Sequence, residues 1–206
     1  MNICQTDAVV VANGTFPIHP VPLGVLRNAR HIVACDGAIA KLAPCASTLT
    51  SDLTIIGDGD SVPDGFRHLL IRVDEQEDND LTKATRYCLE QGWRRIAYLG
   101  ATGLREDHTI GNIALLVRYY RQMGVSGVMF TDHGQFTPAM GTRTFDSRKG
   151  QQVSIFNFGC TQIESEGLRW QSYAYDEWWQ GTLNEATANA FTLRTDGYYL
   201  VYQTYS

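Results

Sequence analysis

The sequence predicts an α/β protein: an N-terminal, doubly wound, mostly parallel sheet of the Rossmann-like type, followed by a C-terminal all-β domain. Short runs rich in Val, Ile and Leu recur through the first half of the 206 residues, and each ends in a polar or glycine-rich turn. Segments with helical periodicity lie between these runs. That periodicity disappears after about residue 133, where aromatic residues become dense. Strand–helix alternation followed by strands alone indicates two architectures in one chain.

The apolar runs of the first half are expected to be strands that are buried on both faces. Runs this short and this rich in branched aliphatic residues are typical of parallel sheets covered by helices. They comprise residues 8–12, 31–35, 53–56, 69–73 and 95–99.

Two helices are predicted between these strands from apolar residues spaced i, i+3, i+4 and i+7. The first runs from Leu81 to Cys88, and Gly92 is its stop signal. The second runs from Ile110 to Val117 and is closed by Gly124. Their apolar faces are expected to pack onto the sheet.

The second half is expected to contain antiparallel strands, because Trp, Tyr and Phe favour half-buried strands. Asp196-Gly197 predicts a two-residue hairpin turn between the last two strands. The expected strands are residues 152–158, 167–175, 188–193 and 198–202. The predicted domains are residues 1–132 and 137–206, joined by a short linker.

The composition excludes several classes of protein. The formal net charge is −5 and no stripe of Lys and Arg is present, so nucleic-acid binding is not expected. The five cysteines are widely spaced and include no C-x-x-C pair, which predicts reduced thiols rather than disulfides or a structural zinc site. No apolar run approaches the length of a membrane span or a signal peptide. A cytoplasmic protein without a membrane partner is therefore the expectation.

Acidic residues gather where predicted strands end: Asp36, then Asp58 and Asp60, then a segment from Asp74 to Asp80. Ligands of open α/β sheets bind at the carboxyl ends of the strands, so parallel pairing would bring these acids to one edge. Several carboxylates at one edge repel each other unless a cation offsets them. Mg²⁺ is the expected cation, since it takes one or two carboxylates together with substrate phosphates.

Three local elements have both a functional and a structural interpretation. In residues 57–61 (GDGDS), Gly59 permits a tight turn that aims Asp58 and Asp60 at one ion, although Asp and Gly also favour plain turns. In residues 74–83, Lys83 could reach a phosphate, but a solvated acidic loop before a helix is the alternative.

The third element, residues 100–108 (GATGLREDH), is a glycine-containing strand-to-helix turn. Such turns offer backbone N–H groups to an anion, and Arg105 could bind phosphate oxygens in a forked geometry. Asp107 is either a helix cap or a member of a metal site. The segment is not a Walker loop, since G-x-x-x-x-G-K-[ST] is absent from the sequence.

Five motifs occur in order along the chain: ANGTFP (12–17), CDGA (35–38), GDGDS (57–61), NDLTKA (79–84) and GATGLREDHTIGN (100–112). Taken together, they resemble the thiamin pyrophosphokinase family. GLRW (167–170) and the pair Leu183-Asn184 resemble the family's β-domain signature. The resemblance covers most of the chain and implies an N-terminal α/β domain, a C-terminal β-sandwich domain and a homodimer with active sites between subunits. The implied reaction converts ATP and thiamin to thiamin diphosphate and AMP.

The resemblance also implies roles for individual residues. The magnesium ligands would be Asp58, Asp60, Glu77 and Asp80. The catalytic acids would be Asp58, Asp60, Asp80 and Asp107, and either Asp80 or Asp107 would accept the proton of the thiamin hydroxyl. The ATP-binding residues would be Asn13, Gly14, Asp36, Lys83, Arg105 and Asp107. Thiamin would be held by Trp170 and Asn184.

The sequence departs from the family pattern at three positions. Leu104 stands where the family often has Gly, Glu77 where it usually has Asp, and Leu183 where it usually has Ser. Two other functions remain open at this point: a magnesium-dependent phosphohydrolase, suggested by the D-x-D element, and a non-catalytic thiamin or nucleotide sensor.

Overall fold

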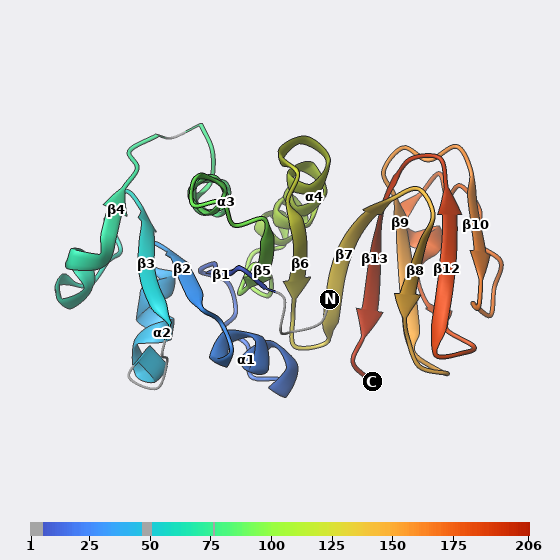
Figure 1. Cartoon of the computed structure of the whole chain (residues 1–206), viewed down its shortest axis with the longest axis horizontal. Coiled ribbons are helices and arrows are strands. Elements are labelled where there is room, and N and C mark those ends of the chain that lie inside the picture. Colours follow the sequence, from blue (N-terminus) through green and yellow to red (C-terminus); the bar gives the residue numbers. More distant parts are fainter. Residues whose placement is uncertain (1–5, 47–50, 76) are drawn as a thin grey trace. The chain divides into compact units, whose positions relative to one another are not determined.

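The computed structural model of the chain describes residues 6–46, 51–75 and 77–206, which fold into two compact units (Figure 1). The first unit takes the chain up to residue 116 together with residues 124–132. The second takes residues 117–123 and 133–206. Each unit has its own sheet architecture.

The first unit is built on a parallel sheet in which every strand pair is parallel. The order reverses between β1 and β5, because the chain first adds strands on one side of β1 and then returns to add β5 and β6 on the other. In sheet order the strands are β6 (Ser126–Phe130), β5 (Arg95–Leu99), β1 (Ala8–Val11), β2 (His31–Cys35), β3 (Asp52–Gly57) and β4 (Leu70–Arg72).

Helices cover both faces of this sheet, as Figure 1 shows. Helices α1 (Pro20–Arg27) and α2 (Ala38–Ala46) lie on one side, and α3 (Asp80–Glu90) and α4 (Glu106–Met123) lie on the other. A 3₁₀ helix, η2 (Asp64–Leu69), connects β3 to β4. The doubly wound α/β fold predicted from the sequence is confirmed.

The buried face of α3 is the predicted one, but the predicted face of α4 is only partly buried: Val117 is buried and Ile113 is half-buried. In α4 the side chain of Ile110 is 56% exposed, and Ala114 is exposed too. The buried residues of α4 are Leu116, Val117 and Tyr119. Apolar spacing marks a helix face, but it does not tell what covers that face.

The second unit contains two antiparallel sheets. One has the order β11 (Asn184–Glu185), β9 (Gln152–Asn157), β13 (Tyr198–Thr204), β7 (Gly134–Met140). The other has the order β10 (Ile163–Glu166), β12 (Ala190–Thr195), β8 (Arg143–Asp146). A 3₁₀ helix, η3 (Trp178–Gly181), precedes β11.

A single buried cluster lies between these two sheets, so the unit is a β-sandwich. Val153, Ile155 and Val201 reach it from the first sheet, and Phe191 and Leu193 reach it from the second. The ring of Phe145 in β8 stacks on that of Phe191 and meets the edge of Tyr199 in β13, with centroid distances of 5.1 and 6.4 Å. Alternating residues on facing strands form such a core.

Three predictions for this half of the chain are wrong. Asp196-Gly197 is not a hairpin turn, because β12 and β13 belong to different sheets. Residues 167–175 contain no strand; Leu168 makes an isolated bridge to Ala186. Residues 134–136, expected in the linker, begin β7.

The described cysteines are not in disulfides: Cys35, Cys88 and Cys160 are buried and Cys45 is half-buried. Cys4 lies outside the described residues. Within the described part of the chain, no helix is both long enough and apolar enough to cross a membrane.

One carboxylate joins the start of β1 to β5. Asp7 Oδ1 accepts from Arg95 Nε at 2.9 Å, and Asp7 Oδ2 accepts from the backbone N–H groups of Arg94 and Arg95. The hydrogen bonds from the Arg95 side chain contribute most to holding the pKa of Asp7 below its usual value. The ionised carboxylate therefore stabilises the fold.

We expect Asp7→Asn to lower the free energy of unfolding by about 1 kcal/mol at pH 7, because charge-assisted bonds are lost at a partly exposed pair. Because the pKa of Asp7 is lower in the folded state, its stabilisation is present above the unfolded-state pKa of about 3.9. It is lost as the pH falls through the folded-state pKa. The deficit should therefore shrink in urea titrations at lower pH. Asp52→Asn, at an exposed carboxylate in β3, is the control; an equal loss there would contradict the assignment.

Candidate active site

The turn after β3 presents two carboxylates in a fixed arrangement. Asp58 Oδ1 accepts from the backbone N–H of Asp60 at 3.1 Å, an Asx-type turn. Gly59 has φ +85°, and a Cβ there would lie 2.7 Å from Leu70 Cδ2. Glycine is therefore required for the tight turn that the sequence predicted.

Asp36 lies at the end of the neighbouring strand, β2, and is 8% exposed. Its Oδ2 accepts from the Ser61 N–H at 3.2 Å, whereas its Oδ1 is buried without a hydrogen-bond partner. Burial raises the pKa of this carboxyl, and the charges of Asp58 and Asp80 raise it further. The backbone also has φ 29°, which is unusual for a residue other than glycine. This combination of burial, repulsion and unusual backbone is typical of functional sites.

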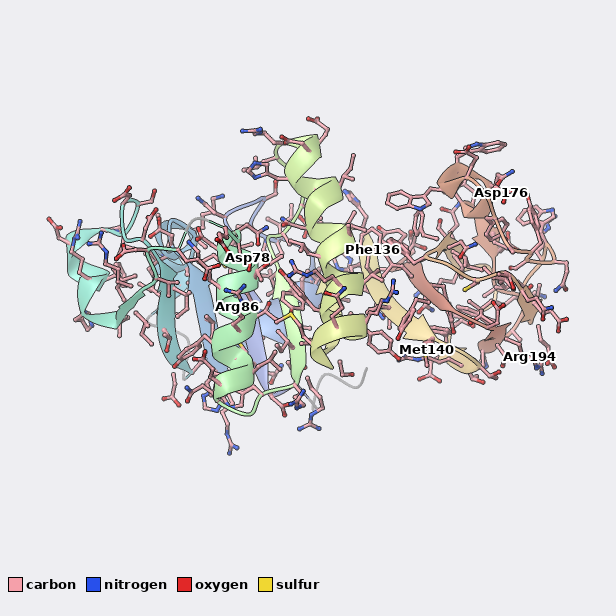
Figure 2. All side chains as sticks on the ribbon, turned by 90° about the horizontal axis from the view of Figure 1, so that it is seen from above. Asp78, Arg86, Phe136, Met140, Asp176 and Arg194 are labelled. Carbon is pink, nitrogen blue, oxygen red and sulfur yellow. The ribbon has the colours of Figure 1, made fainter. Side chains whose placement is uncertain are left out.

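The acidic segment before α3 is largely paired with arginines. Arg86 of α3 binds Glu75 at 2.8 Å and also binds Asp78, whose side chain meets it in Figure 2. Arg72 binds Asp74 at 2.6 Å. The structural interpretation of Asp74 and Asp78 is thus favoured, and Glu77 is left as an exposed carboxylate.

Asp80 begins α3 and is positioned by its neighbours. Asn79 caps the helix, accepting from the Thr82 N–H at 3.0 Å, a type of cap worth about 1 kcal/mol. Lys83, one turn later, is buried and places its Nζ 3.3 Å from Asp80 Oδ1 and 3.4 Å from the Val73 carbonyl. The ammonium of Lys83 therefore orients Asp80.

A cavity of about 430 Å³ lies at the point where the strand order reverses, between the ends of β1 and β5. Open α/β sheets bind ligands at this switch point. Of the residues predicted from the sequence, Asn13, Gly14, Asp80 and Arg105 line the cavity. Its other lining residues are Ala12, Cys35, Asn79, Leu81, Ala101, Thr102, Leu104, His108, Thr109 and Asn112.

Cys35 is not a nucleophile in this cavity. Burial, followed by the nearby charges of Asp80 and Asp36, raises the pKa of its thiol well above the ordinary value. The thiolate, which is the reactive form, is therefore disfavoured.

Arg105 and Asp107, at the start of α4, bind each other. Arg105 Nη2 donates to Asp107 Oδ2 at 2.5 Å and its Nε donates to Oδ1 at 3.1 Å. The arginine holds the pKa of Asp107 below its usual value, and the His108 N–H adds to this effect. Both side chains are exposed, so Arg105 can exchange this partner for a phosphate.

The acid set is coupled but does not form a preassembled metal cage. The charge of Asp58 raises the pKa of Asp36, and the charges of Asp58 and Asp60 raise the pKa of Arg72. These carboxylates therefore lie near one another. Among the described residues, no three His, Cys, Asp or Glu side chains are arranged to hold a metal ion. Mg²⁺ needs only one or two carboxylates when phosphate oxygens complete its shell. The unpartnered oxygen of Asp36 and the charge at this edge fit such an ion.

The second unit has a smaller pocket of about 260 Å³, which contains both residues predicted to hold thiamin. Trp170 is 53% exposed, and Arg169 places its guanidinium carbon 5.0 Å from the Trp170 ring centroid. Asn184 is buried; its Oδ1 accepts from the Trp170 N–H at 3.1 Å and its Nδ2 donates to the Trp170 carbonyl at 2.7 Å. The side chain of Asn184 thus holds Trp170 in place.

Sequence reasoning missed several residues that shape the first cavity. Lys41 of α2 donates to the carbonyls of Asn13 at 2.7 Å and Gly14 at 2.5 Å, fixing the loop after β1. Asn112 donates to the Ala101 carbonyl at 2.7 Å, and its Oδ1 accepts from Asn79. Asn112 is the last residue of the GATGLREDHTIGN motif and Asn79 stands at a helix-cap position, so the sequence could have indicated both. Nothing in the sequence indicated Lys41.

Two family models match the chain. Residues 24–126, half of its length, match the model described as thiamin pyrophosphokinase, catalytic domain. Residues 134–202 match the model described as thiamin pyrophosphokinase, substrate-binding domain. Thiamin pyrophosphokinase 1 of Caenorhabditis elegans is 31% identical over 102 residues, which are 45% of this chain and 42% of that protein. The match therefore spans less than half the length of that relative.

Solved structures with the same fold cover nearly the whole chain. Thiamin pyrophosphokinase from Candida albicans has a TM-score of 0.79 at 16% identity, covering 98% of this chain and 90% of its own. The enzyme from Bacillus subtilis has a TM-score of 0.77 at 17% identity, with 96% and 98% covered. That from Geobacillus thermodenitrificans has 0.76 at 20% identity, with 97% of each chain covered. At these identities the likeness establishes the fold alone.

Proposed function

Because the chain belongs to the thiamin pyrophosphokinase family, whose catalytic-domain model matches half of it, we propose that it transfers the pyrophosphoryl group of ATP to the hydroxyl of thiamin, giving thiamin diphosphate and AMP. The observation that supports the proposal is the cavity at the switch point, which is lined by Asp80, whose charge raises the pKa of Asp36. A polyphosphate with its cation fits that combination of backbone loops and acids.

The residues around the cavity would contribute to ATP binding in different ways. Asn13 and Gly14 form the wall at β1, held by Lys41 and by backbone hydrogen bonds to the turn after β5. Arg105 would bind phosphate oxygens after leaving Asp107. Asp58, Asp60, Glu77 and Asp80 would hold Mg²⁺, which supplies neutralisation of the negative charge on the phosphates. Lys83 acts through Asp80 and not by reaching a phosphate.

In the transfer step, the hydroxyl oxygen of thiamin forms a bond to the β-phosphorus of ATP. The bond between that phosphorus and the oxygen that bridges the α- and β-phosphorus atoms breaks, and AMP leaves with this oxygen. The hydroxyl proton must pass to a base. Of the two candidates, Asp80 lines the cavity and Asp107 does not. We therefore propose that Asp80 accepts the proton. Catalysis by positioning and charge neutralisation is enough for this chemistry.

Thiamin would bind in the pocket of the second unit, where Trp170 offers an aromatic face to a cationic ring and Asn184 keeps that tryptophan in place. We further propose a homodimer in which the two kinds of pocket meet between subunits. The exposed apolar side chains of Leu104 and Ile110 support an apolar contact between protein chains. A cytoplasmic location is proposed because the reaction consumes ATP and none of the described cysteines is in a disulfide.

The test is to incubate the purified chain with ATP, Mg²⁺ and thiamin and to measure AMP and thiamin diphosphate. We expect the two products in equal amounts and neither product when thiamin or Mg²⁺ is omitted. Release of inorganic phosphate without thiamin would favour a phosphohydrolase instead. Tight binding of thiamin without AMP would favour a sensor. Sedimentation of the same preparation should give twice the mass of the chain.

A further inference from the structure

Leu183, which lines the pocket of the second unit, has an unusual backbone conformation. Its φ is 64°, and among the described residues Asp36 is the other non-glycine residue with positive φ. A leucine in the left-handed region costs free energy, because its Cβ crowds the following carbonyl. Glycine or asparagine would adopt the same backbone more easily. An unusual conformation at a ligand pocket is a reason to look for a function of the side chain.

The surroundings of Leu183 hold this conformation in place. Asn184, the next residue, pairs with Val153 in the sheet and is locked to the backbone of Trp170 by its side chain. The Leu183 N–H donates to Ser154 Oγ at 3.3 Å. The backbone is therefore determined by its neighbours, while the side chain is left 67% exposed.

The pocket combines aromatic and polar surfaces. Trp170 and Tyr173 are each 53% exposed, and Tyr175 is buried at the pocket wall. Gln171, Gln180 and Thr182 supply amide and hydroxyl groups to the same pocket. Leu183 is its aliphatic lining residue. A flat ring with alkyl substituents can stack on an aromatic face while its alkyl groups contact an aliphatic wall.

We propose that Leu183 determines the specificity of this pocket by providing an aliphatic wall for the alkyl groups of the bound heteroaromatic ring. This inference rests on the proposed function, since it takes thiamin as the ligand. The side chain favours ligands whose rings carry methyl or longer alkyl groups over ligands that lack them. Its exposed apolar surface becomes covered on binding, which compensates for the cost of the left-handed backbone.

The experiment measures binding by calorimetry, without ATP, for the full chain and three variants. Leu183→Asn and Leu183→Gly accept the left-handed backbone but remove the aliphatic wall. Leu183→Met keeps an aliphatic side chain and is the matched control. The ligands are thiamin and an analogue without the ring methyl groups.

We expect Leu183→Asn and Leu183→Gly to bind thiamin about tenfold more weakly, with an unchanged or higher melting temperature. Both variants should lose most of the preference for thiamin over the demethylated analogue. Leu183→Met should bind thiamin within about threefold of the natural chain. A merely structural role of Leu183 would leave both the affinity for thiamin and the preference over the demethylated analogue as they were.

The inference is overturned if Leu183→Asn and Leu183→Gly bind thiamin as tightly as the natural chain. It is also overturned if the natural chain does not bind thiamin. Failure of the proposed function gives a different result: thiamin binds and the variants weaken it, yet the natural chain releases no AMP from ATP and Mg²⁺. In that case the pocket assignment stands and the transfer reaction does not.

Discussion

Replacing Asp60 with Asn is expected to reduce AMP formation at least a hundredfold while leaving the fold intact. The carboxylate is exposed on a turn that the Asp58 side chain and Gly59 define, so the turn does not depend on its charge. A metal ion at a phosphoryl group supplies several kcal/mol of charge stabilisation, and each 1.36 kcal/mol is a factor of ten in rate. Asp60 is one of the ligands proposed for that ion. The measurement is the initial rate of AMP release at saturating ATP and thiamin, repeated over a series of Mg²⁺ concentrations.

The matched control is Asp64→Asn. Asp64 is also exposed and lies four residues further along, where it pairs with Arg67 in η2. It should keep the natural rate within about twofold. If Asp60→Asn turned over as fast as Asp64→Asn at every Mg²⁺ concentration, Asp60 would have no part in holding the metal.

Replacing Gly14 with Ala is expected to abolish nucleotide binding and to destabilise the chain by about 2–3 kcal/mol. A Cβ on Gly14 would lie 2.3 Å from the Gly100 carbonyl oxygen and 2.5 Å from that of Thr102. Both contacts are to backbone, which cannot rotate away. Separating the two loops would break the bonds from the Gly14 N–H to Gly100 and from the Thr15 N–H to Thr102, each worth about 1 kcal/mol.

Urea unfolding and calorimetric titration with ATP would check this expectation. Gly24→Ala is the control, since a Cβ at Gly24 meets nothing within 4 Å and alanine favours the helix in which it lies. That variant should be as stable as the natural chain or slightly more stable. A Gly14→Ala chain with natural stability and natural ATP affinity would mean that the two loops can move apart without cost.

The sequence predicted five of the six strands of the parallel sheet, because the composition of buried strands is recognisable locally; β6 was not predicted. The bounds of β2 and β5 agree residue for residue with the apolar runs. The Asp196-Gly197 prediction failed for a tertiary reason. Asp196 uses its carboxylate to accept from Thr161 and Gln162, and two intervening residues can carry a chain between two sheets as well as around a hairpin.

In the candidate site, too, some features could be predicted from the sequence and others could not. Asp36, Asp58 and Asp80 follow strands or begin a helix, so their meeting at one edge could be predicted from strand parallelism. The sequence could not predict which group each charged side chain binds. That Arg105 would bind Asp107, or that Lys83 would orient Asp80, depends on rotamers and burial that spacing does not encode. Likewise, the sequence did not show that Asn184 would bind the backbone of Trp170 and the Glu185 N–H.

The arginine pairing of the segment before α3 has a consequence for its charge balance. Residues 74–80 contain five carboxylates, a formal charge of −5. Arg72, Arg86 and Lys83 bind four of them and add three positive charges, which leaves −2. The net repulsion within this segment in solution is therefore far smaller than its composition suggests.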